Sequence, residues 1–342
     1  MAHTRSVTPI KPGLSFCLQQ MVMRGYDVRR LVAGTSLAEG SYTNPETLMT
    51  LEHELQVYRN LFREASSGAI GLELGQAVNL NAVGVLGGLL SNSIDLGHAG
   101  YLLRRFELLV STFVKSELMG ELGPGKIIIR YRRKPELGEL YRFFVDRDIA
   151  GQRGLLLEVF GEGARHFVTK IEFGYPRPRE AKRYPLALGC PVSFGHDDTH
   201  VTYDYRLAPV ANEGRSVISY NIYHYLCRTA LNIYVPTTWQ QRVLNILSSS
   251  NEFPKAEKAA AKLNCSERSL RRHLNDEGCQ YSELVDRVRF DRAMYLLTHS
   301  RDPIKKIGLQ LGYSEPANFV HAFTRWSGIS PSQFRHSITA RR

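Results

Sequence analysis

The sequence has few cysteines and no long apolar run. Its 342 residues include five cysteines, and no two of them have the C-x-x-C spacing. An odd and scattered set argues against a disulfide framework and against a structural zinc site. The longest apolar stretch, residues 82–90, contains three glycines and is too short to cross a bilayer, which takes about 20 apolar residues. The cysteines are Cys17, Cys190, Cys227, Cys265 and Cys279.

Signals for export and for catalysis are also missing. Residues 1–13 carry basic side chains, but no apolar segment follows them as in a signal peptide. We therefore expect a cytoplasmic protein with no membrane contact. No Ser/His/Asp, Cys/His or phosphate-loop pattern has a convincing context, so we expect neither an enzyme nor a cofactor. His196 and His200 have metal-ligand spacing only on a helix, and their segment has the pattern of a strand and turn.

Positive charge is concentrated near the C-terminus. The whole chain has a formal net charge of +11. Residues 237–342 contain 17 Lys and Arg against 10 Asp and Glu, a net +7, whereas the 236 residues before them contain 27 against 23, a net +4. A basic domain suits a polyanionic partner, because neutralising phosphates releases condensed counterions. The chain length favours two domains, which we predict at 1–236 and 237–342.

The pattern of residues 1–236 predicts a mixed α+β domain. Helices are expected in two parts of residues 13–32, broken near Gly25, and strands at the β-branched or alternating segments. Dense glycines at 68–88 indicate turns or tight helix packing. Further helices are expected at 46–62, 100–117, 140–160 and 220–234, and strands at 126–132, 167–173, 192–194 and 200–207.

One local pattern occurs twice in the C-terminal third. Ala260, Asn264 and Ser266 recur about 48 residues later as Gly308, Gly312 and Ser314. The small residue allows two helices to cross closely, Asn or Gly suits a tight turn, and the serine is expected to cap the next helix. Apolar pairs at i and i+4 then bury the inner face of that helix: Leu270 and Leu274 in the first copy, Phe319 and Phe323 in the second. This pattern predicts an all-α domain with two helix-turn-helix motifs, whose second helices enter the major groove of DNA.

The outer faces of the two second helices supply the candidate DNA-binding residues. Three arginines at i, i+3 and i+4 in the first copy match the geometry of guanine edges and phosphates, although a charge run is often only a solvated face. The second copy is far less basic and is expected to bind more weakly. The candidates are Ser266, Arg268, Arg271 and Arg272 in the first copy, and Ala317, Asn318 and His321 in the second.

A helix expected at 281–298 joins the two copies. Its 18 residues would span about 27 Å at 1.5 Å per residue, which is compatible with two recognition helices about one turn of B-DNA apart. Ser330 and Pro331 then begin a closing helix as its cap and first residue.

Residues 304–335, IKKIGLQLGYSEPANFVHAFTRWSGISPSQFR, strongly resemble the signature of the AraC/XylS family of transcription regulators. The resemblance covers about residues 240–336. It implies a DNA-binding domain that activates transcription by recruiting RNA polymerase. The chain departs from the family pattern in three places. Gly308 replaces the usual alanine, Pro316 lies in the first turn of the second recognition helix, and His321 stands where arginine is common.

The N-terminal part resembles the sensor domain of a subgroup of that family, through GLELGQAVNLNAVGVLGGLLSNSIDLGHAGYLLRRF and LALGCPVSF. This resemblance implies a small-molecule effector, whose identity and binding residues we leave open, and a possible homodimer. The sensor type is sometimes labelled arabinose-binding, but the helical start argues against the sugar-binding β-sandwich. Two alternatives stay open: an N-terminal interaction module without a ligand, and an enzyme fused to a DNA-binding domain. The tyrosines at 203, 205, 220, 223 and 225 could line a ligand pocket, but are more often core residues.

Overall fold

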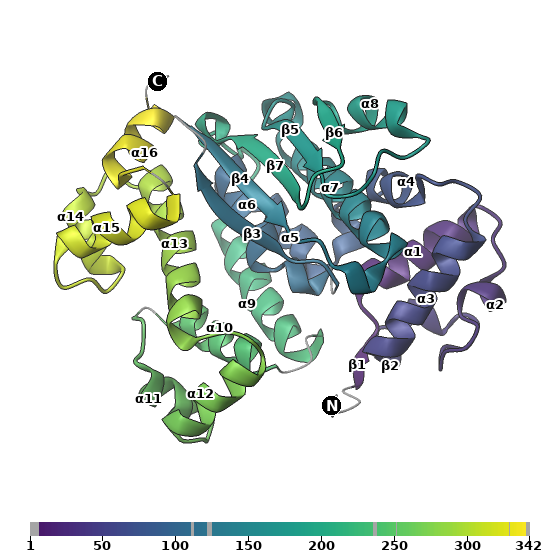
Figure 1. Cartoon of the computed structure of the whole chain (residues 1–342), viewed down its shortest axis with the longest axis horizontal. Helices are drawn as coiled ribbons and strands as arrows, with labels where there is room; N and C mark the ends of the chain where they lie inside the picture. The colour runs from purple at the N-terminus through teal and green to yellow at the C-terminus, as the bar shows by residue number, and fades with distance from the viewer. Residues whose placement is uncertain are drawn as a thin grey trace. The chain divides into compact units, whose positions relative to one another are not determined.

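The computed structural model describes residues 7–110, 113–121, 125–234, 238–250, 252–327 and 329–339. The chain separates into two compact units (Figure 1). Unit 1 is Met1–Leu118 with Ile127–Pro236, and unit 2 is Met119–Lys126 with Thr237–Arg342. The predicted domain boundary at Pro236 lies outside the described residues. Within the described ranges, no helix is long and apolar enough to cross a membrane.

Unit 1 begins with a small antiparallel ribbon. Strand β1 (Val7–Pro9) pairs with β2 (Leu48–Thr50), with Val7 opposite Thr50. Helix α3 (Leu51–Glu64) follows β2 directly, and the Thr50 side chain accepts a hydrogen bond from the His53 backbone N–H at 3.1 Å. Two further helices lie between the strands, α1 (Pro12–Met23) and α2 (Val28–Leu31). The chain leaves α1 through Gly25, whose φ of +88° suits glycine.

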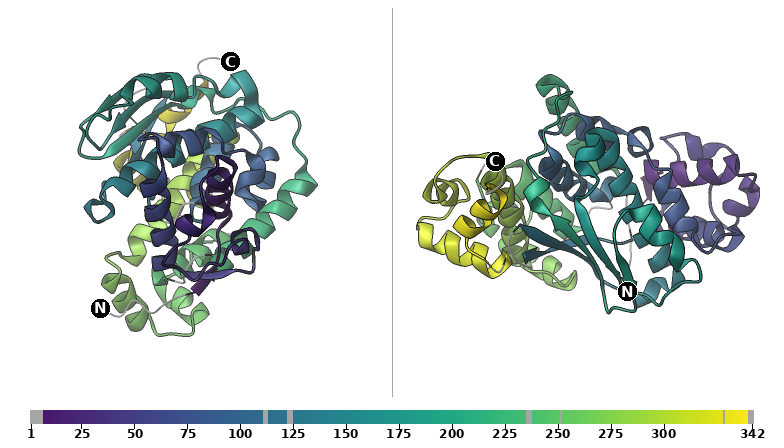
Figure 2. Two further views of the ribbon diagram at one scale, coloured as in Figure 1. Left: turned by 90° about the vertical axis from the view of Figure 1, so that its right-hand side faces the viewer. Right: turned by 90° about the horizontal axis from the view of Figure 1, so that it is seen from above.

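A five-stranded mixed sheet in the order β3-β4-β7-β5-β6 lies mostly in unit 1, and the residues of β3 and β4 that fall within 119–126 belong to unit 2. Strand β5 runs parallel to β6 and antiparallel to β7. Figure 1 shows α5, α6 and α7 beside the strands of this sheet, with α4 packed on α7, and Figure 2 gives two further views. The strands are β3 (Ser116–Glu121), β4 (Lys126–Tyr131), β5 (Val168–Phe173), β6 (Val192–Phe194) and β7 (Thr199–Asp204). The remaining helices are α4 (Ile70–Gln76), α5 (Val85–Ser91), α6 (Leu96–Arg105), α7 (Glu139–Phe160), α8 (Tyr184–Leu188) and α9 (Val217–Tyr234).

Helix α7 is the centre of unit 1, and two glycines let α4 pack directly on its backbone. A Cβ added at Gly71 would lie 2.5 Å from the Phe143 carbonyl oxygen, and one at Gly75 would lie 2.5 Å from that of Arg147. Neither position has room for a side chain. The glycines noted at 68–88 therefore include two that permit tight helix packing, as the sequence indicated.

Unit 2 contains seven helices in the described residues. These are α10 (Trp239–Ser249), α11 (Ala256–Lys262), α12 (Glu267–Asp276), α13 (Tyr281–His299), α14 (Ile304–Gln310), α15 (Pro316–Ser327) and α16 (Pro331–Thr339). The α+β first part and the helical second part confirm the predicted fold class.

Three predicted elements differ from the structure. The helix expected at 46–62 starts only at Leu51, because residues 48–50 pair with β1. The helix expected at 100–117 is wrong beyond Arg105, where α6 ends, since residues 116–121 form β3. The strand expected at 200–207 ends at Asp204, whose side chain accepts a hydrogen bond from the Arg206 backbone N–H and starts a short 3-10 turn.

Candidate nucleic-acid interface

The first repeat folds as helix α11, a tight turn and helix α12. Asn264 forms the turn with a φ of +53°, the one positive φ at a non-glycine residue among those the structure describes. Asparagine tolerates this left-handed conformation better than most residues. Ser266 then caps α12, and its hydroxyl accepts a hydrogen bond from the Ser269 backbone N–H at 3.2 Å. These two residues confirm the predicted turn and cap.

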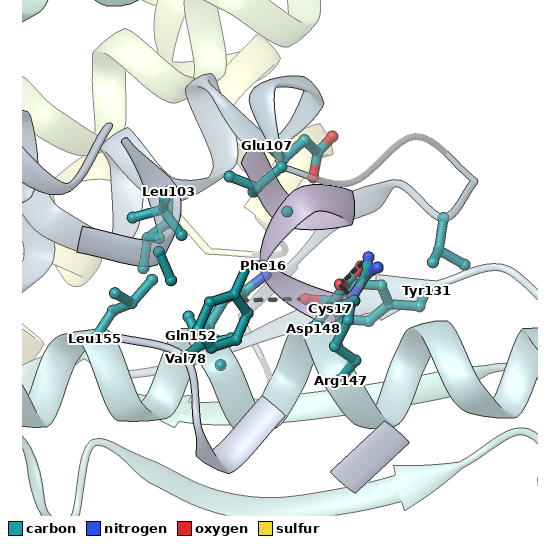
Figure 3. Close-up of a pocket in the computed structure, with 16 residues that line it drawn as sticks. Phe16, Cys17, Val78, Leu103, Glu107, Tyr131, Arg147, Asp148, Gln152 and Leu155 are labelled. Atoms are coloured by element: carbon teal, nitrogen blue, oxygen red, sulfur yellow. Dashed lines mark hydrogen bonds and ion pairs between the residues drawn. The ribbon is translucent and has the colours of Figure 1, made fainter. Parts of the chain in front are cut away.

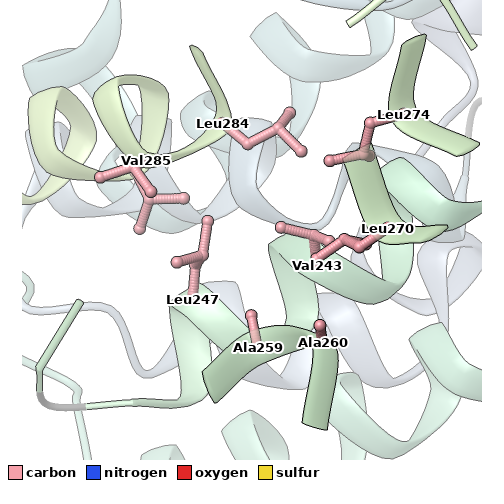
Figure 4. Packing of buried hydrophobic residues seen from close by; sticks show 9 residues of the cluster. Val243, Leu247, Ala259, Ala260, Leu270, Leu274, Leu284 and Val285 are labelled. Atoms are coloured by element: carbon pink, nitrogen blue, oxygen red, sulfur yellow. The ribbon is translucent and has the colours of Figure 1, made fainter. Parts of the chain in front are cut away.

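Buried apolar residues hold α12 against its neighbours. Leu270 and Leu274 are fully buried and meet Ala259 and Ala260 of α11. Figure 4 shows these side chains pointing toward Val243 and Leu247 of α10 and toward Leu284 and Val285 of α13. Burying one leucine contributes about 1.5–3 kcal/mol, so the orientation of α12 is set by its inner face.

The opposite face of α12 is exposed and basic. Arg268, Arg271 and Arg272 are all exposed, and they recur at the i, i+3 and i+4 spacing that places side chains on one side of a helix. Arg271 donates to Glu267, with Nε 2.8 Å and Nη2 2.6 Å from the Glu267 Oε1. This exposed ion pair holds the Arg271 side chain along the helix, and contributes only modestly to stability.

The second repeat folds as helix α14, a turn and helix α15. Gly312 forms the turn with a φ of +78°, and a Cβ added at Gly308 would lie 3.2 Å from the Cβ of Phe319. Gly308 therefore allows the close helix crossing that its small size predicted. The predicted cap is wrong here: α15 begins at Pro316, so Glu315 and not Ser314 directly precedes it. The extra residue in this turn moves the serine one position too early.

The inner face of α15 is aromatic. Phe319 and Phe323 are fully buried, and the ring of Phe323 packs against Phe290 of α13 and Phe334 of α16. The outer candidates Ala317, Asn318 and His321 are exposed. The two repeats thus share a buried inner face, while only the first presents a cluster of cations outside.

Two arginines of the linking helix α13 contact residues that flank the repeats. The Arg289 guanidinium lies 5.0 Å from the ring centre of Phe253 and 4.5 Å from that of Tyr313, and its Nε donates to the Leu311 carbonyl at 3.0 Å. Arg292 stacks on the same Phe253 ring at 4.9 Å. Phe253 lies between α10 and α11, whereas Tyr313 lies in the second turn, so Arg289 touches both repeats.

Burial moves the pKa values of two tyrosines in this interior further above physiological pH. It raises the pKa of Tyr281 to about 12, and its hydroxyl donates to the Pro254 carbonyl at 2.6 Å. Burial also raises the pKa of Tyr313, against the opposing effect of Arg289. Both hydroxyl groups therefore stay protonated at physiological pH.

Sequence reasoning missed these positioning residues. Arg289 and Arg292 lie inside the predicted linking helix, but nothing local marked them as bridges between repeats. A second missed contact joins the end of α12 to the start of α10: the Glu277 carboxylate accepts hydrogen bonds from the backbone N–H groups of Trp239 and Gln240, both at 2.8 Å. A weak signal existed, since a lone carboxylate after one helix can cap the start of another.

The alternative sites in unit 1 have ordinary structural surroundings. The His196 Nε2 lies 2.8 Å from the Ser193 hydroxyl, and no group of three metal-ligating side chains occurs in the described ranges. Tyr203 and Tyr205 are buried, whereas Tyr225 is 67% exposed.

Both parts of the chain match known protein families. Residues 25–209 match the family model of the arabinose-binding domain of AraC transcription regulators, N-terminal, and residues 259–337 match a helix-turn-helix domain. The ornithine utilization regulator of Pseudomonas aeruginosa is 28% identical over 79% of this chain and 79% of its own length. The transcriptional regulator VqsM of the same species is 30% identical over 82% of this chain and 88% of its own. The crystal structure of CdpR, also from P. aeruginosa, has a TM-score of 0.41 at 23% identity and covers 82% of this chain and 90% of that one.

These features define a transcription regulator with a helix-turn-helix DNA-binding domain and an arabinose-binding-like N-terminal domain. Its named relatives are regulators of transcription and not enzymes. The chain belongs to the AraC family.

Proposed function

We propose that this protein is a transcription activator controlled by a small-molecule effector. Residues 1–236 bind the effector and pair two copies, and residues 237–342 bind double-stranded DNA and present RNA polymerase with its contact. The effector acts by favouring one arrangement of the DNA-binding domains, a coupling of about 1–3 kcal/mol.

The observation that carries DNA binding is the two-sided character of α12. Its inner leucines are fully buried, and its outer arginines are exposed. Three guanidinium groups on one exposed face match phosphates and guanine edges. We assign the base and phosphate contacts of the first repeat to Ser266, Arg268, Arg271 and Arg272, and the weaker contacts of the second to Ala317, Asn318 and His321.

An exposed apolar stripe on α9 supports the homodimer. Ile218 is 74% exposed, Ile222 54% and Tyr225 67%, at spacings that place them on one face. Val217, Leu226 and Ile233 are also exposed, and Arg228 is the one Lys, Arg, Asp or Glu of this helix. Apolar, charge-depleted patches with tyrosine are typical of interface cores. In a two-fold symmetric dimer the same patch of both copies meets, so the partner of this stripe is α9 of a second copy.

Footprinting on the DNA upstream of the protein's own gene, repeated with candidate metabolites, tests the proposal. We expect protection of two neighbouring major-groove segments per copy, changed by one metabolite class. A variant with Arg268, Arg271 and Arg272 all replaced by alanine should lose the footprint while its circular dichroism stays unchanged. Unchanged DNA affinity across the whole panel would favour the interaction module without a ligand.

Sedimentation velocity tests the homodimer separately. The double variant Ile218→Glu, Ile222→Glu should sediment as a monomer when the unaltered protein sediments as a dimer. Leu186→Glu is the matched control, because Leu186 is 90% exposed on α8 and lies outside the stripe. A dimer that survives the double variant would contradict the role of α9.

A further inference from the structure

Unit 1 contains a mostly apolar cavity beside its central helix. Figure 3 shows Phe16 of α1, Leu103 of α6 and Leu155 of α7 around it, together with Val78. The cavity volume that the centre of a water-sized sphere can occupy is about 50 Å³. On the same measure, one buried water needs about 10–15 Å³. The cavity therefore has space for several waters or for one small organic molecule.

The charged groups of the lining already have partners. The Arg147 guanidinium donates to Asp148 Oδ1 from Nε at 2.9 Å and from Nη2 at 2.7 Å. It also donates to the Tyr58 hydroxyl at 2.9 Å. The Glu107 carboxylate accepts the Ser116 hydroxyl at 2.5 Å and the Ser116 backbone N–H at 3.1 Å. A charged ligand would have to displace one of these buried partnerships, which is costly.

One polar group of the lining remains available. The Tyr131 hydroxyl donates to the Gln152 Oε1 at 3.2 Å, and this bond uses the acceptor end of the amide. No acceptor for the Gln152 Nε2 occurs in the part of the chain that the structure describes. Burial raises the pKa of the Cys17 thiol, so this group lines the cavity uncharged. The cavity thus offers apolar walls and one amide donor.

We infer that this cavity binds a small, uncharged, mainly apolar molecule with one hydrogen-bond acceptor, such as a ketone, ester or lactone. A sugar fits poorly, because each buried hydroxyl needs a partner, and among the side-chain nitrogens of the described lining Gln152 Nε2 alone has no acceptor. Any effect of this ligand on DNA binding rests on the effector control proposed above. The cavity is lined by the helices α1, α6 and α7 and by strand β4, so an occupant contacts both helices and the sheet.

Three probes of similar size separate the ligand classes: 4′-fluoroacetophenone, 4-fluorobenzoate and 4-fluorobenzylamine. Fluorine NMR titration of the full-length protein measures their binding. We expect the neutral ketone to bind at least about tenfold more tightly than either ion. One amide donor does not replace the hydration that a carboxylate loses, and an ammonium would have to displace an existing partner of a buried carboxylate. Equal or tighter binding of either ion would overturn the proposed ligand class.

Variants then locate the site. Ala82→Trp and Val78→Trp should each abolish ketone binding by filling the cavity, and two positions guard against one variant failing to fold. Gln152→Leu should weaken it about two- to tenfold, the effect of one neutral hydrogen bond. Leu186→Ser is the control for apolar surface binding, because Leu186 is 90% exposed on α8 and does not line the cavity; it should leave ketone binding unchanged. Ketone binding that survives both folded tryptophan variants would overturn the assignment of the cavity.

A DNA-binding titration keeps this inference separate from the proposed function. Ketone binding that is lost in Ala82→Trp, without any ketone effect on DNA affinity, supports the cavity and contradicts effector control through it. A metabolite response of DNA affinity that persists in both folded tryptophan variants supports effector control and overturns the cavity as its site.

Discussion

The first helix-turn-helix repeat presents Arg268, Arg271 and Arg272 on α12, whereas the second presents Ala317, Asn318 and His321 on α15. Inside, the two are alike: a small residue at the helix crossing, a left-handed turn residue and an i, i+4 apolar pair with no exposed surface. The inner residues therefore set the fold of each repeat, whereas the outer residues, which the fold does not need, are the ones that we propose to contact DNA.

The largest effects are expected from the shared inner face. Leu270→Ala should cost about 2–5 kcal/mol and Phe319→Ala about 3–5 kcal/mol, because each leaves a cavity in a packed core. Hydrogen exchange on the full chain should show α12 losing protection in the first variant and α15 in the second. Asp276→Ala, an exposed change on α12, is the control. Equal loss in both repeats from either change would contradict their separate inner cores.

On DNA, Arg271→Ala should have the largest single effect of the outer residues. A bidentate contact to guanine is worth about 1–3 kcal/mol, so affinity should fall by that amount and preference should relax at one base pair. Selection from a randomised operator pool measures both. Arg301→Ala removes the same charge from the loop after α13 and should leave the preference intact. A uniform loss on every sequence would show that Arg271 contacts phosphate alone.

The two turns are expected to respond differently to alanine. Gly312→Ala should cost about 1–2 kcal/mol, the penalty for a side chain in the left-handed region, and its Cβ would also lie 3.4 Å from the Arg289 Nη2. Asn264→Ala should cost less, because asparagine already carries a Cβ, and Asn264→Gly should be nearly neutral. Urea unfolding of the full chain measures all three. A larger cost at Asn264 than at Gly312 would reverse the comparison.

The smallest effect is expected from His321→Ala. One neutral hydrogen bond is worth about 0.5–1.5 kcal/mol, and the second outer face has no arginine among its candidates. Gel-shift titration measures the DNA affinity of this variant and of Arg271→Ala on the same operator. A loss that matches that of Arg271 would mean that the two repeats bind DNA with similar strength.

The local features of unit 2 could be predicted from sequence because neighbouring residues determine them. The Ser266 cap, the Asn264 and Gly312 turns and the buried pairs all depend on spacings of a few residues. The Ser314 cap failed because one added residue shifted the start of α15 to Pro316.

Features set by distant pairing could not be predicted in the same way. Residues 48–50 continue a helical pattern, yet they form β2 because β1 pairs with them across about 40 residues of chain. The contacts of Arg289 with Phe253 and Tyr313 and the lining of the unit 1 cavity also depend on several elements meeting in space. Their residues carry no shared local pattern.

The unbroken helix α13, from Tyr281 to His299, has a consequence for how this regulator can change over evolution. An α-helix turns by about 100° and advances about 1.5 Å with each residue. A single insertion within α13 would therefore rotate the second helix-turn-helix repeat by about 100° relative to the first. Exchange of exposed side chains leaves this geometry unchanged, whereas an insertion or deletion within α13 reorients one whole repeat relative to the other.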